Sequence, residues 1–242
     1  MTFSIVARCA ETGQVGICIA TGSPSVGNRC IFAAANVGAL TFQAVAEPRL
    51  GQLGLNLLKA GYSAAKVLAE LAATDPGHDW RQIGVVDQQG RTAVHTGTRN
   101  GAYAGHAVGN GFIALGNVLE GPDVPKAIAA GFEHARGEKF EERLMRAIES
   151  GRNAGGQGRE LGQTSAAILT YDRASFAYVD LRVDHALEPI AELRRIFDWH
   201  KPYFDYFVER ADNYEILGHR AWIKQQGFER EYGVPAPKKP WP

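Results

Sequence analysis

Apolar and polar side chains alternate along the first twenty residues of the chain. The alternating apolar positions are Phe3, Ile5, Ala7 and Cys9, and then Val15, Ile17 and Ile19. A period of two is typical of β-strands, and the polar, glycine-containing residues 11–14 between the two runs are typical of a turn. The pattern therefore predicts a β-hairpin over residues 2–21, with Thr2 at the start of its first strand.

Hairpins and pairs of helices follow one another along the rest of the chain. A nearly uncharged run at 31–46, split by Gly38, predicts a second hairpin. Further strands are predicted at 83–87, 91–96, 111–115, and from residues 164 and 176 onward. Helical spacing of apolar residues predicts helices at 50–60, 63–73, 124–136 and 139–151, with a last helix from Pro189.

This order of elements favours one fold class. Hairpins imply antiparallel pairing, and strands this apolar need cover on both faces. Two antiparallel sheets that pack on each other, each with a helix pair on its outer face, satisfy both conditions. The sequence thus predicts an α+β fold, a four-layer α-β-β-α sandwich, rather than a doubly wound parallel sheet.

Composition divides the chain into two parts. With 242 residues and 45% hydrophobic content the chain can bury a large core, which we place in a sandwich domain over residues 1–197. Residues 198–242 are dense in Trp, Tyr and Phe alternating with charges, and they end in a proline-rich tail. Such a surface suits packing against the domain's own flank or a second subunit, and we expect a homo-oligomer through this extension.

The charge balance limits the expected partners. Lys and Arg together number 26, as do Asp and Glu, so no net field attracts nucleic acid or an anionic membrane. We expect neither as a partner, only a small-molecule substrate or ligand. The N-terminus has no basic region followed by an apolar run, and no segment is long and apolar enough to span a bilayer, so we expect a soluble, cytoplasmic protein.

Cysteine and glycine patterns predict neither a metal nor a cofactor. Cys9, Cys18 and Cys30 lie in apolar, strand-like segments without the paired spacing of a zinc site, which predicts buried free thiols. The glycine-rich segment 155–165 does not join a strand to a helix as a phosphate-binding loop does. We therefore expect no metal and no nucleotide cofactor; the segment is interpreted as a lid or as a close approach to a neighbouring chain.

Several short segments, taken in order, resemble one protein family. They are MTFSIVAR, VGALTFQA, EPRLG, IGVVDQQGRTAVHTG, GNVLEGPDV, GGQGRELGQTSAAIL and DLRVDHALEPIAELRR. Over roughly residues 1–197 the chain resembles the bacterial family named domain of unknown function 1028, and many matches in register are more specific than any one of them. The resemblance implies the N-terminal nucleophile (Ntn) hydrolase fold, which is the same four-layer sandwich, and it implies no substrate.

The chemistry of that superfamily directs attention to Thr2. A threonine made N-terminal by loss of Met1 carries a nucleophile and a base in one residue, because its own α-amine can accept the hydroxyl proton. The alternative is that Thr2 is simply a common β-former at the start of a strand. The two function classes are therefore an amide-bond hydrolase and a catalytically silent fold that binds a small ligand or scaffolds a homo-oligomer.

Supporting residues for catalysis are nominated by residue type and place. Ntn hydrolases usually hold a cation near the nucleophile, but the second hairpin has no lysine, so Arg49 or Arg8 is nominated for this charge. Arg8 has a surface or salt-bridged alternative. The amide of Asn117 is an oxyanion donor or, alternatively, a turn residue.

Substrate-binding candidates come from loops and from polar residues in apolar segments. His95 ends a strand as an acid, a base or a merely hydrogen-bonded residue, and Gln43 in its apolar strand is either bonded internally or directed into a site. Loop residues at the expected rim complete the set. The substrate-binding candidates are Ser23, Ser25, Gln43, His95, Gln163 and Ser165.

Overall fold

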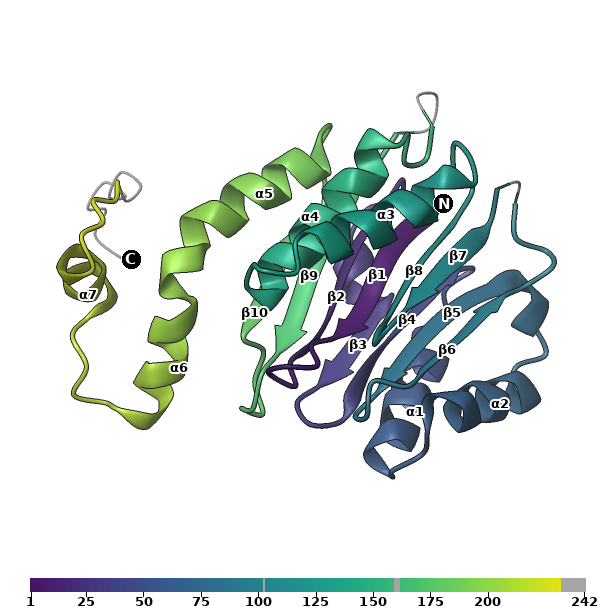
Figure 1. The fold of residues 1–242 in the computed structure, drawn as a ribbon, viewed down its shortest axis with the longest axis horizontal. Coiled ribbons are helices and arrows are strands. Elements are labelled where there is room, and N and C mark those ends of the chain that lie inside the picture. Colours follow the sequence, from purple (N-terminus) through teal and green to yellow (C-terminus); the bar gives the residue numbers. More distant parts are fainter. Residues whose placement is uncertain (102, 159–161, 232–242) are drawn as a thin grey trace, which may run out of the picture. The chain divides into compact units, whose positions relative to one another are not determined.

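The computed structural model describes residues 1–101, 103–158 and 162–231. The chain divides into two compact units, Met1–Phe197 and Asp198–Pro242, each of which is described by itself. The first unit contains two antiparallel sheets with helices on their outer faces (Figure 1).

The larger sheet has the first hairpin at its centre. In spatial order its strands are β10 (Val179–Val183), β9 (Ser165–Tyr171), β2 (Val15–Thr21), β1 (Thr2–Arg8), β8 (Phe112–Asn117) and β7 (Gly105–Gly109). Every pairing in this sheet is antiparallel, and Thr2 lies opposite Thr21 on one side and Asn117 on the other. The first residue of β1 is therefore held between two neighbouring strands.

The smaller sheet is also antiparallel throughout. Its strands, in spatial order, are β3 (Ile31–Ala34), β4 (Gly38–Ala44), β5 (Arg81–Asp87) and β6 (Thr92–Thr96). Strands β4 and β5 pack against β1, β2 and β8 of the larger sheet. The second hairpin thus faces the first across the space between the sheets.

Two helix pairs cover the outer faces of the sheets. Helices α1 (Pro48–Lys59) and α2 (Ala64–Thr74) pack on the smaller sheet, and α3 (Asp123–His134) and α4 (Phe140–Asn153) pack on the larger one. The layering is visible in Figure 1, where α3 and α4 cross β1 and β8 while α1 and α2 lie beside β4, β5 and β6. The predicted α+β fold, a four-layer α-β-β-α sandwich, is confirmed.

Capping residues set several helix ends. The carboxylate of Glu47 accepts the backbone N–H of Arg49 at the start of α1, and the hydroxyl of Ser63 accepts that of Lys66 at the start of α2. These are the N-cap bonds that Glu and Ser side chains supply to otherwise unpaired helical N–H groups. Pro48 also stands in the first turn of α1, where a missing N–H is harmless.

One strand was not predicted from the sequence. Strand β7 is short, begins and ends with glycine, and has alternating exposed side chains at His106 and Val108. Its weak apolar pattern gives little strand signal by itself. It forms because it pairs with the fully buried β8 at the edge of the larger sheet.

The second unit is helical where it is described. It contains the end of α5 (Pro189–His200), α6 (Phe204–Asp212) and α7 (His219–Gln225), which enclose a small cluster of Tyr203, Tyr206 and Ile223. The hydroxyl of Tyr206 donates to Leu217 O at 3.1 Å. The predicted proline-rich tail lies outside the described residues.

Two sequence-based expectations concern cysteines and membranes. Cys9, Cys18 and Cys30 are buried free thiols, as predicted. Among the described residues, no helix combines the length and the apolar character needed to cross a bilayer.

Candidate functional site

The inner faces of the two sheets change from apolar to polar toward the start of β1. In the middle of the sandwich these faces present buried aliphatic residues such as Val6, Ile19 and Ile113. Because side chains on one face of a strand recur every second residue, Ser4 and Thr2 continue the row of Val6, and Thr21 continues that of Ile19. The layer between the sheets therefore ends in polar side chains.

We call these side chains the inter-sheet polar network. It comprises Thr2, Ser4, Thr21, Thr41, Gln43, Gln82, Thr96, His106 and Asn117. They come from β1, β2, β7 and β8 of the larger sheet and from β4, β5 and β6 of the smaller one. Most are fully buried, so the hydrogen bonds among them decide whether burying them is tolerable.

Gln82 is the centre of this network. Its Oε1 accepts from Gln43 Nε2 at 2.8 Å and from Asn117 Nδ2 at 3.0 Å. Its Nε2 donates to Gly116 O at 2.9 Å and has Gly105 O and Thr96 Oγ1 within 3.1 Å. One side chain thus ties β5 to β4, β6, β7 and β8.

Two hydroxyls and a histidine extend the network on either side. Ser4 Oγ and Thr41 Oγ1 donate to Gln43 Oε1 at 2.8 and 3.2 Å. At the edge, Thr96 Oγ1 and His106 Nδ1 are 3.1 Å apart. Partial burial lowers the pKa of His106, which favours the neutral imidazole at neutral pH. All nine side chains of the network are then uncharged.

Thr2 lies at the end of the network beside the N-terminus. It is 4% exposed, and its hydroxyl lies 3.2 Å from Thr21 Oγ1 and donates to Met1 O at 2.6 Å. The hydroxyl of Thr21 also donates to Met1 O. Burial lowers the pKa of the N-terminal amine, since desolvation penalises its charged form. The carbonyl of Met1 thus accepts hydrogen bonds from two hydroxyls, and the amine of the same residue has a lowered pKa.

Backbone strain accompanies two network residues. Ala44 follows Gln43 with φ 74°, and Val118 follows Asn117 with φ 52°. Residues with a Cβ, and β-branched ones above all, rarely adopt positive φ, at a cost of about 1–3 kcal/mol each. Such strain concentrates at functional sites, so its place directly after two network amides supports a functional interpretation of this end of the sandwich.

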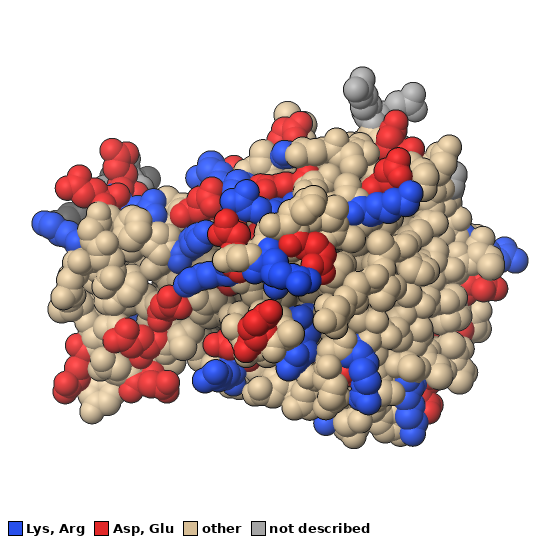
Figure 2. All heavy atoms as spheres, in the orientation of Figure 1, with Lys and Arg blue, Asp and Glu red and all other residues tan. Residues whose placement is uncertain are grey.

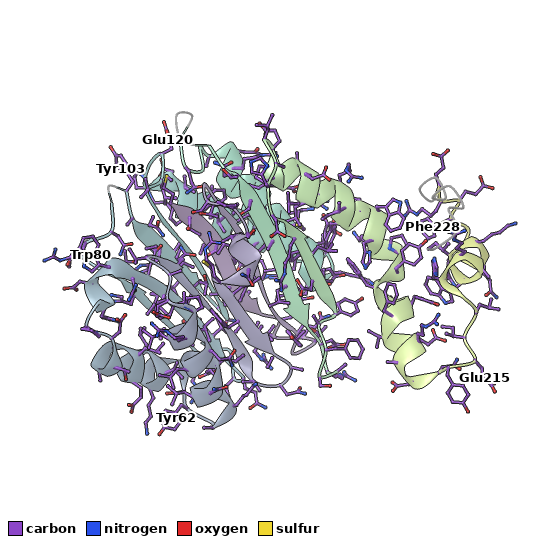
Figure 3. The ribbon with its side chains drawn as sticks, turned by 180° about the vertical axis from the view of Figure 1, so that it is seen from behind. Tyr62, Trp80, Tyr103, Glu120, Glu215 and Phe228 are labelled. Carbon is purple, nitrogen blue, oxygen red and sulfur yellow. The ribbon has the colours of Figure 1, made fainter. Side chains whose placement is uncertain are left out.

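A glycine-rich segment packs against the same end. Thr164 N donates to Thr21 O at 2.7 Å and Thr164 Oγ1 to Gly22 O at 3.0 Å. Glu120, three residues after Asn117, donates its N–H to Gly156 O at 3.0 Å. From behind, Tyr103 and Glu120 lie beside each other at this end of the first unit (Figure 3). Gly156 and Thr164 therefore lie at the same end of the sandwich as Thr21 and Asn117.

Arg49 is not brought into the network, which corrects its predicted role. Its side chain is 88% exposed, and its guanidinium donates to both carboxylate oxygens of Glu47 at 2.9 and 2.7 Å. The same side chain holds the pKa of Glu47 at about 2. Arg8, the other nominated cation, donates to Cys9 O at the opposite end of β1.

His95 also lies away from the network. Its ring stacks on His78 with centroids 3.6 Å apart, and its Nε2 lies 3.0 Å from His78 O. Because His95 is paired with Ile83, whose side chain packs under α1 and α2, it faces the helices rather than the other sheet. The next residue, Thr96, belongs to the network instead, through its contact with Gln82 Nε2 at 3.1 Å.

The loop residues that were predicted to bind substrate differ in where they lie and in what they contact. Ser165 is fully buried, and its hydroxyl donates to Ser23 O at 2.7 Å and accepts from Val26 N at 3.1 Å, which is a structural role in holding segment 22–28. Ser25 has a left-handed backbone (φ 57°) at the start of the short turn Val26–Asn28. Gln163 is half-buried, and its Nε2 lies against Gly156.

Of the nominated residues, the structure places Thr2, Gln43 and Asn117 at the same end of the sandwich, and other polar residues lie with them. The missed residues are Ser4, Thr21, Thr41, Gln82, Thr96 and His106. The available signal was a polar residue at an alternate position of an otherwise apolar strand, as for Ser4 in TFSIVAR and Gln82 in RQIGVVD.

The surface charge of the visible face is mixed. Figure 2 shows Lys and Arg interspersed with Asp and Glu over α3 and α4. Several of these form ion pairs, including Arg146 with Glu142 at 3.1 Å and Arg194 with Glu142 at 3.0 Å. Paired charges of both signs give this face no single-signed field for an extended polyanion.

Comparison with known proteins identifies the family. The family described as "Family of unknown function (DUF1028)" matches residues 2–193. The chain belongs to this DUF1028 family. A search of curated proteins found no match.

Among solved structures, the chain is similar to another member of the DUF1028 family. Protein SPO2555 from Silicibacter pomeroyi is 30% identical, with a TM-score of 0.75 over 83% of this chain and 89% of that chain. A match to Anbu (ancestral beta-subunit) from Yersinia bercovieri has 11% identity and a TM-score of 0.36 over 86% and 97% of the two chains. The DUF1028 fold is thus shared by a protein from another source.

Proposed function

We propose that this DUF1028 protein is an N-terminal nucleophile hydrolase that cleaves an amide bond of a small substrate after Met1 has been removed. The position of Thr2 carries the proposal. Thr2 begins a central strand at the polar end of the sandwich, and its hydroxyl lies 3.2 Å from that of Thr21. Its partner in the neighbouring strand is Asn117, whose amide donates to Gln82 in the buried network.

Loss of Met1 would convert the Thr2 amide nitrogen into a free amine in a buried place. Burial already lowers the pKa of the amine of Met1, whose residue is 38% exposed, and Thr2 is only 4% exposed. A neutral amine beside a hydroxyl can take its proton as the oxygen attacks a carbonyl carbon. The same group then returns the proton to the leaving nitrogen.

Thr21 is the hydroxyl best placed to stabilise the developing oxyanion. Its hydroxyl and that of Thr2 already donate to a carbonyl oxygen, that of Met1. Removing Met1 frees this position beside the new amine for the carbonyl of a substrate. If Thr2 uses its hydroxyl as the nucleophile, Thr21 remains as the donor, with Asn117 opposite Thr2 in the neighbouring strand.

One observation favours the alternative of a catalytically silent fold. While Met1 is attached, the Thr2 nitrogen is an amide and cannot act as a base, and the network side chains carry no cation to assist it. In that state the fold would bind a small ligand or scaffold a homo-oligomer. The amine at residue 2 is therefore what distinguishes the two functions.

The test compares three N-termini by turnover on a panel of acyl amides, with intact-mass measurement of each chain. Thr2→Ala should lose at least about a thousandfold in turnover, as removal of a nucleophile does, and Thr2→Ser should keep partial activity. A chain with a retained N-terminal extension should be inactive although its Thr2 hydroxyl is intact. Turnover of the processed chain should fall as pH drops through the lowered amine pKa, because protonation removes the base.

Thr12→Ala is the matched control, since Thr12 lies in the exposed turn of the same hairpin. It should leave turnover unchanged. Equal turnover by the wild type and Thr2→Ala would remove Thr2 from the mechanism. Retention of Met1 in the native protein, or no turnover with any amide, would favour the silent alternative.

A further inference from the structure

Within the described part of the chain, one buried side chain near Met1 has no hydrogen-bond partner. Gln157 is 2% exposed, and both its Nε2 and its Oε1 are buried without a partner. A buried amide normally satisfies these atoms, because an unpaired polar group loses its bonds to water without compensation. A buried amide without a partner at the edge of a candidate site is therefore available to bind a ligand.

The glycines around Gln157 hold it in this position. Gly156 and Gly158 on either side have φ 54° and 79°, in the left-handed region that favours glycine. A Cβ at Gly158 would approach Glu120 Oε2 to 2.6 Å. The backbone is fixed from both sides, since Gly156 accepts from Glu120 N and donates to Gly151 O, each at 3.0 Å.

Met1 and Gln157 share the space above Gly22. A Cβ placed at Gly22 would lie 3.3 Å from the terminal methyl of Met1 and 3.8 Å from Gln157 Oε1. Gly22 directly follows Thr21, whose hydroxyl belongs to the candidate site. The terminal methyl of Met1 and Oε1 of Gln157 therefore both lie near Gly22, next to the Thr2–Thr21 pair.

We propose that loss of Met1 opens a substrate subsite there and that Gln157 recognises an uncharged carboxamide group in it. The proposal rests on the proposed function in that Met1 must leave. A carboxamide of the substrate offers one donor and one acceptor, the complement of the Gln157 amide, so a paired contact satisfies both orphan atoms. The neighbouring network is uncharged and the Glu120 carboxylate lies against Gly158, so a substrate carboxylate would be desolvated there without a counter-charge.

The substrate class is thus a small neutral molecule with a carboxamide or ureide group, and Gln157 is a specificity-determining residue. A substrate that lacks the N–H or the C=O leaves one of the Gln157 atoms unpaired. Sites built to bond a polar group reject analogues without it more strongly than apolar pockets do.

The experiment measures binding separately from turnover. Chains that begin at residue 2 are prepared by proteolytic removal of a leader, with Thr2→Ala as the common background, and are titrated with propionamide, propionate and butanone by ligand-observed NMR. Propionamide should bind at least about tenfold more tightly than either analogue, a difference of about 1.4 kcal/mol. The same chain with Met1 retained should bind propionamide at least about tenfold more weakly, because methionine fills the subsite.

Gln157→Met and the surface control Gln52→Met separate the role of this amide from general effects of the substitution. Gln157→Met should abolish the preference for propionamide. It should not lower the melting temperature, because it removes an unpaired polar group and keeps a side chain of similar length. Gln52→Met, on the exposed side of α1, should change neither property.

Equal affinities for the three probes, unchanged binding in Gln157→Met, or binding unaffected by Met1 would each overturn the proposal, as would no binding at all. Failure of the hydrolase hypothesis gives a different set of results. The Thr2 variants would then show no difference in turnover, while selective binding of propionamide through Gln157 would persist.

Discussion

Replacing Gln82 by methionine should destabilise the sandwich strongly, although the two side chains are similar in size. Gln82 is fully buried at the centre of the inter-sheet polar network, where its amide bonds to side chains and carbonyls from both sheets. Methionine fills the space but offers neither donor nor effective acceptor. Gln43, Asn117 and Gly116 cannot turn to water, because they are buried as well.

The magnitude follows from the bonds that Gln82 makes. Its oxygen accepts two, from Gln43 and Asn117, and its two N–H groups can serve two of the three acceptors nearby. Four bonds are lost, and at least the Nε2 of Gln43 is left without a partner in the described network. At roughly 0.5–1.5 kcal/mol a bond, the loss is about 2–6 kcal/mol of unfolding free energy.

Thermal unfolding followed by circular dichroism is the assay. For a unit of this size about 1 kcal/mol corresponds to roughly 2–4 °C, so Gln82→Met should melt about 4–24 °C below the wild type. Gln82→Glu should be at least as unstable at neutral pH, since a buried carboxylate would face the carbonyls of Gly105 and Gly116. Gln52→Met serves as the exposed control. A shift below about 2 °C in Gln82→Met would refute the claim that this network holds the sheets together.

Two further predictions concern stability and assembly. Burial acts to raise the pKa of Asp87, but hydrogen bonds from Ala64 N, Arg91 and Gln89 N outweigh it and lower the pKa. Asp87→Asn should therefore lower the free energy of unfolding in urea by about 2–4 kcal/mol at neutral pH. This difference from the wild type should narrow below about pH 4, because the wild-type carboxylate is then protonated. The exposed control Asp123→Asn should change the free energy of unfolding little. Removal of residues 198–242, which expose Trp199 and Phe207, should reduce a homo-oligomer to a monomer in light scattering; an unchanged subunit number would contradict this.

The fold could be predicted because most of its strands have a recognisable pattern in the local sequence. A period of two along residues 2–21 and the turn at 88–90 are properties of neighbouring residues, and hairpins leave little freedom in pairing. Strand β7 was missed because its residues lack this alternation and fold as a strand only through β8. Local pattern therefore sufficed wherever the strand was buried on both faces.

The candidate site was less accessible to prediction because it depends on the register between the two sheets. Thr2 could be nominated from its place after Met1, Gln43 as a polar residue in an apolar strand, and Asn117 from its place after a strand. Gln82 joins Gln43 and Asn117 only after the sheets pack. Arg49 was misplaced even though a nearby signal existed. Glu47 precedes it by two residues and captures its guanidinium at the surface.

An uncharged site suits a nucleophile that carries its own base. A lysine or arginine beside Thr2 would lower the amine pKa by charge repulsion, but it would also attract anions and need its own partner in a buried layer. Here desolvation lowers the pKa of the Met1 amine instead, and Thr2 is the more buried of the two residues. While Met1 is attached, its carbonyl oxygen accepts hydrogen bonds from two hydroxyls. Removal of one residue would thus create the base, free the carbonyl position and open the space beside Gln157 in a single step.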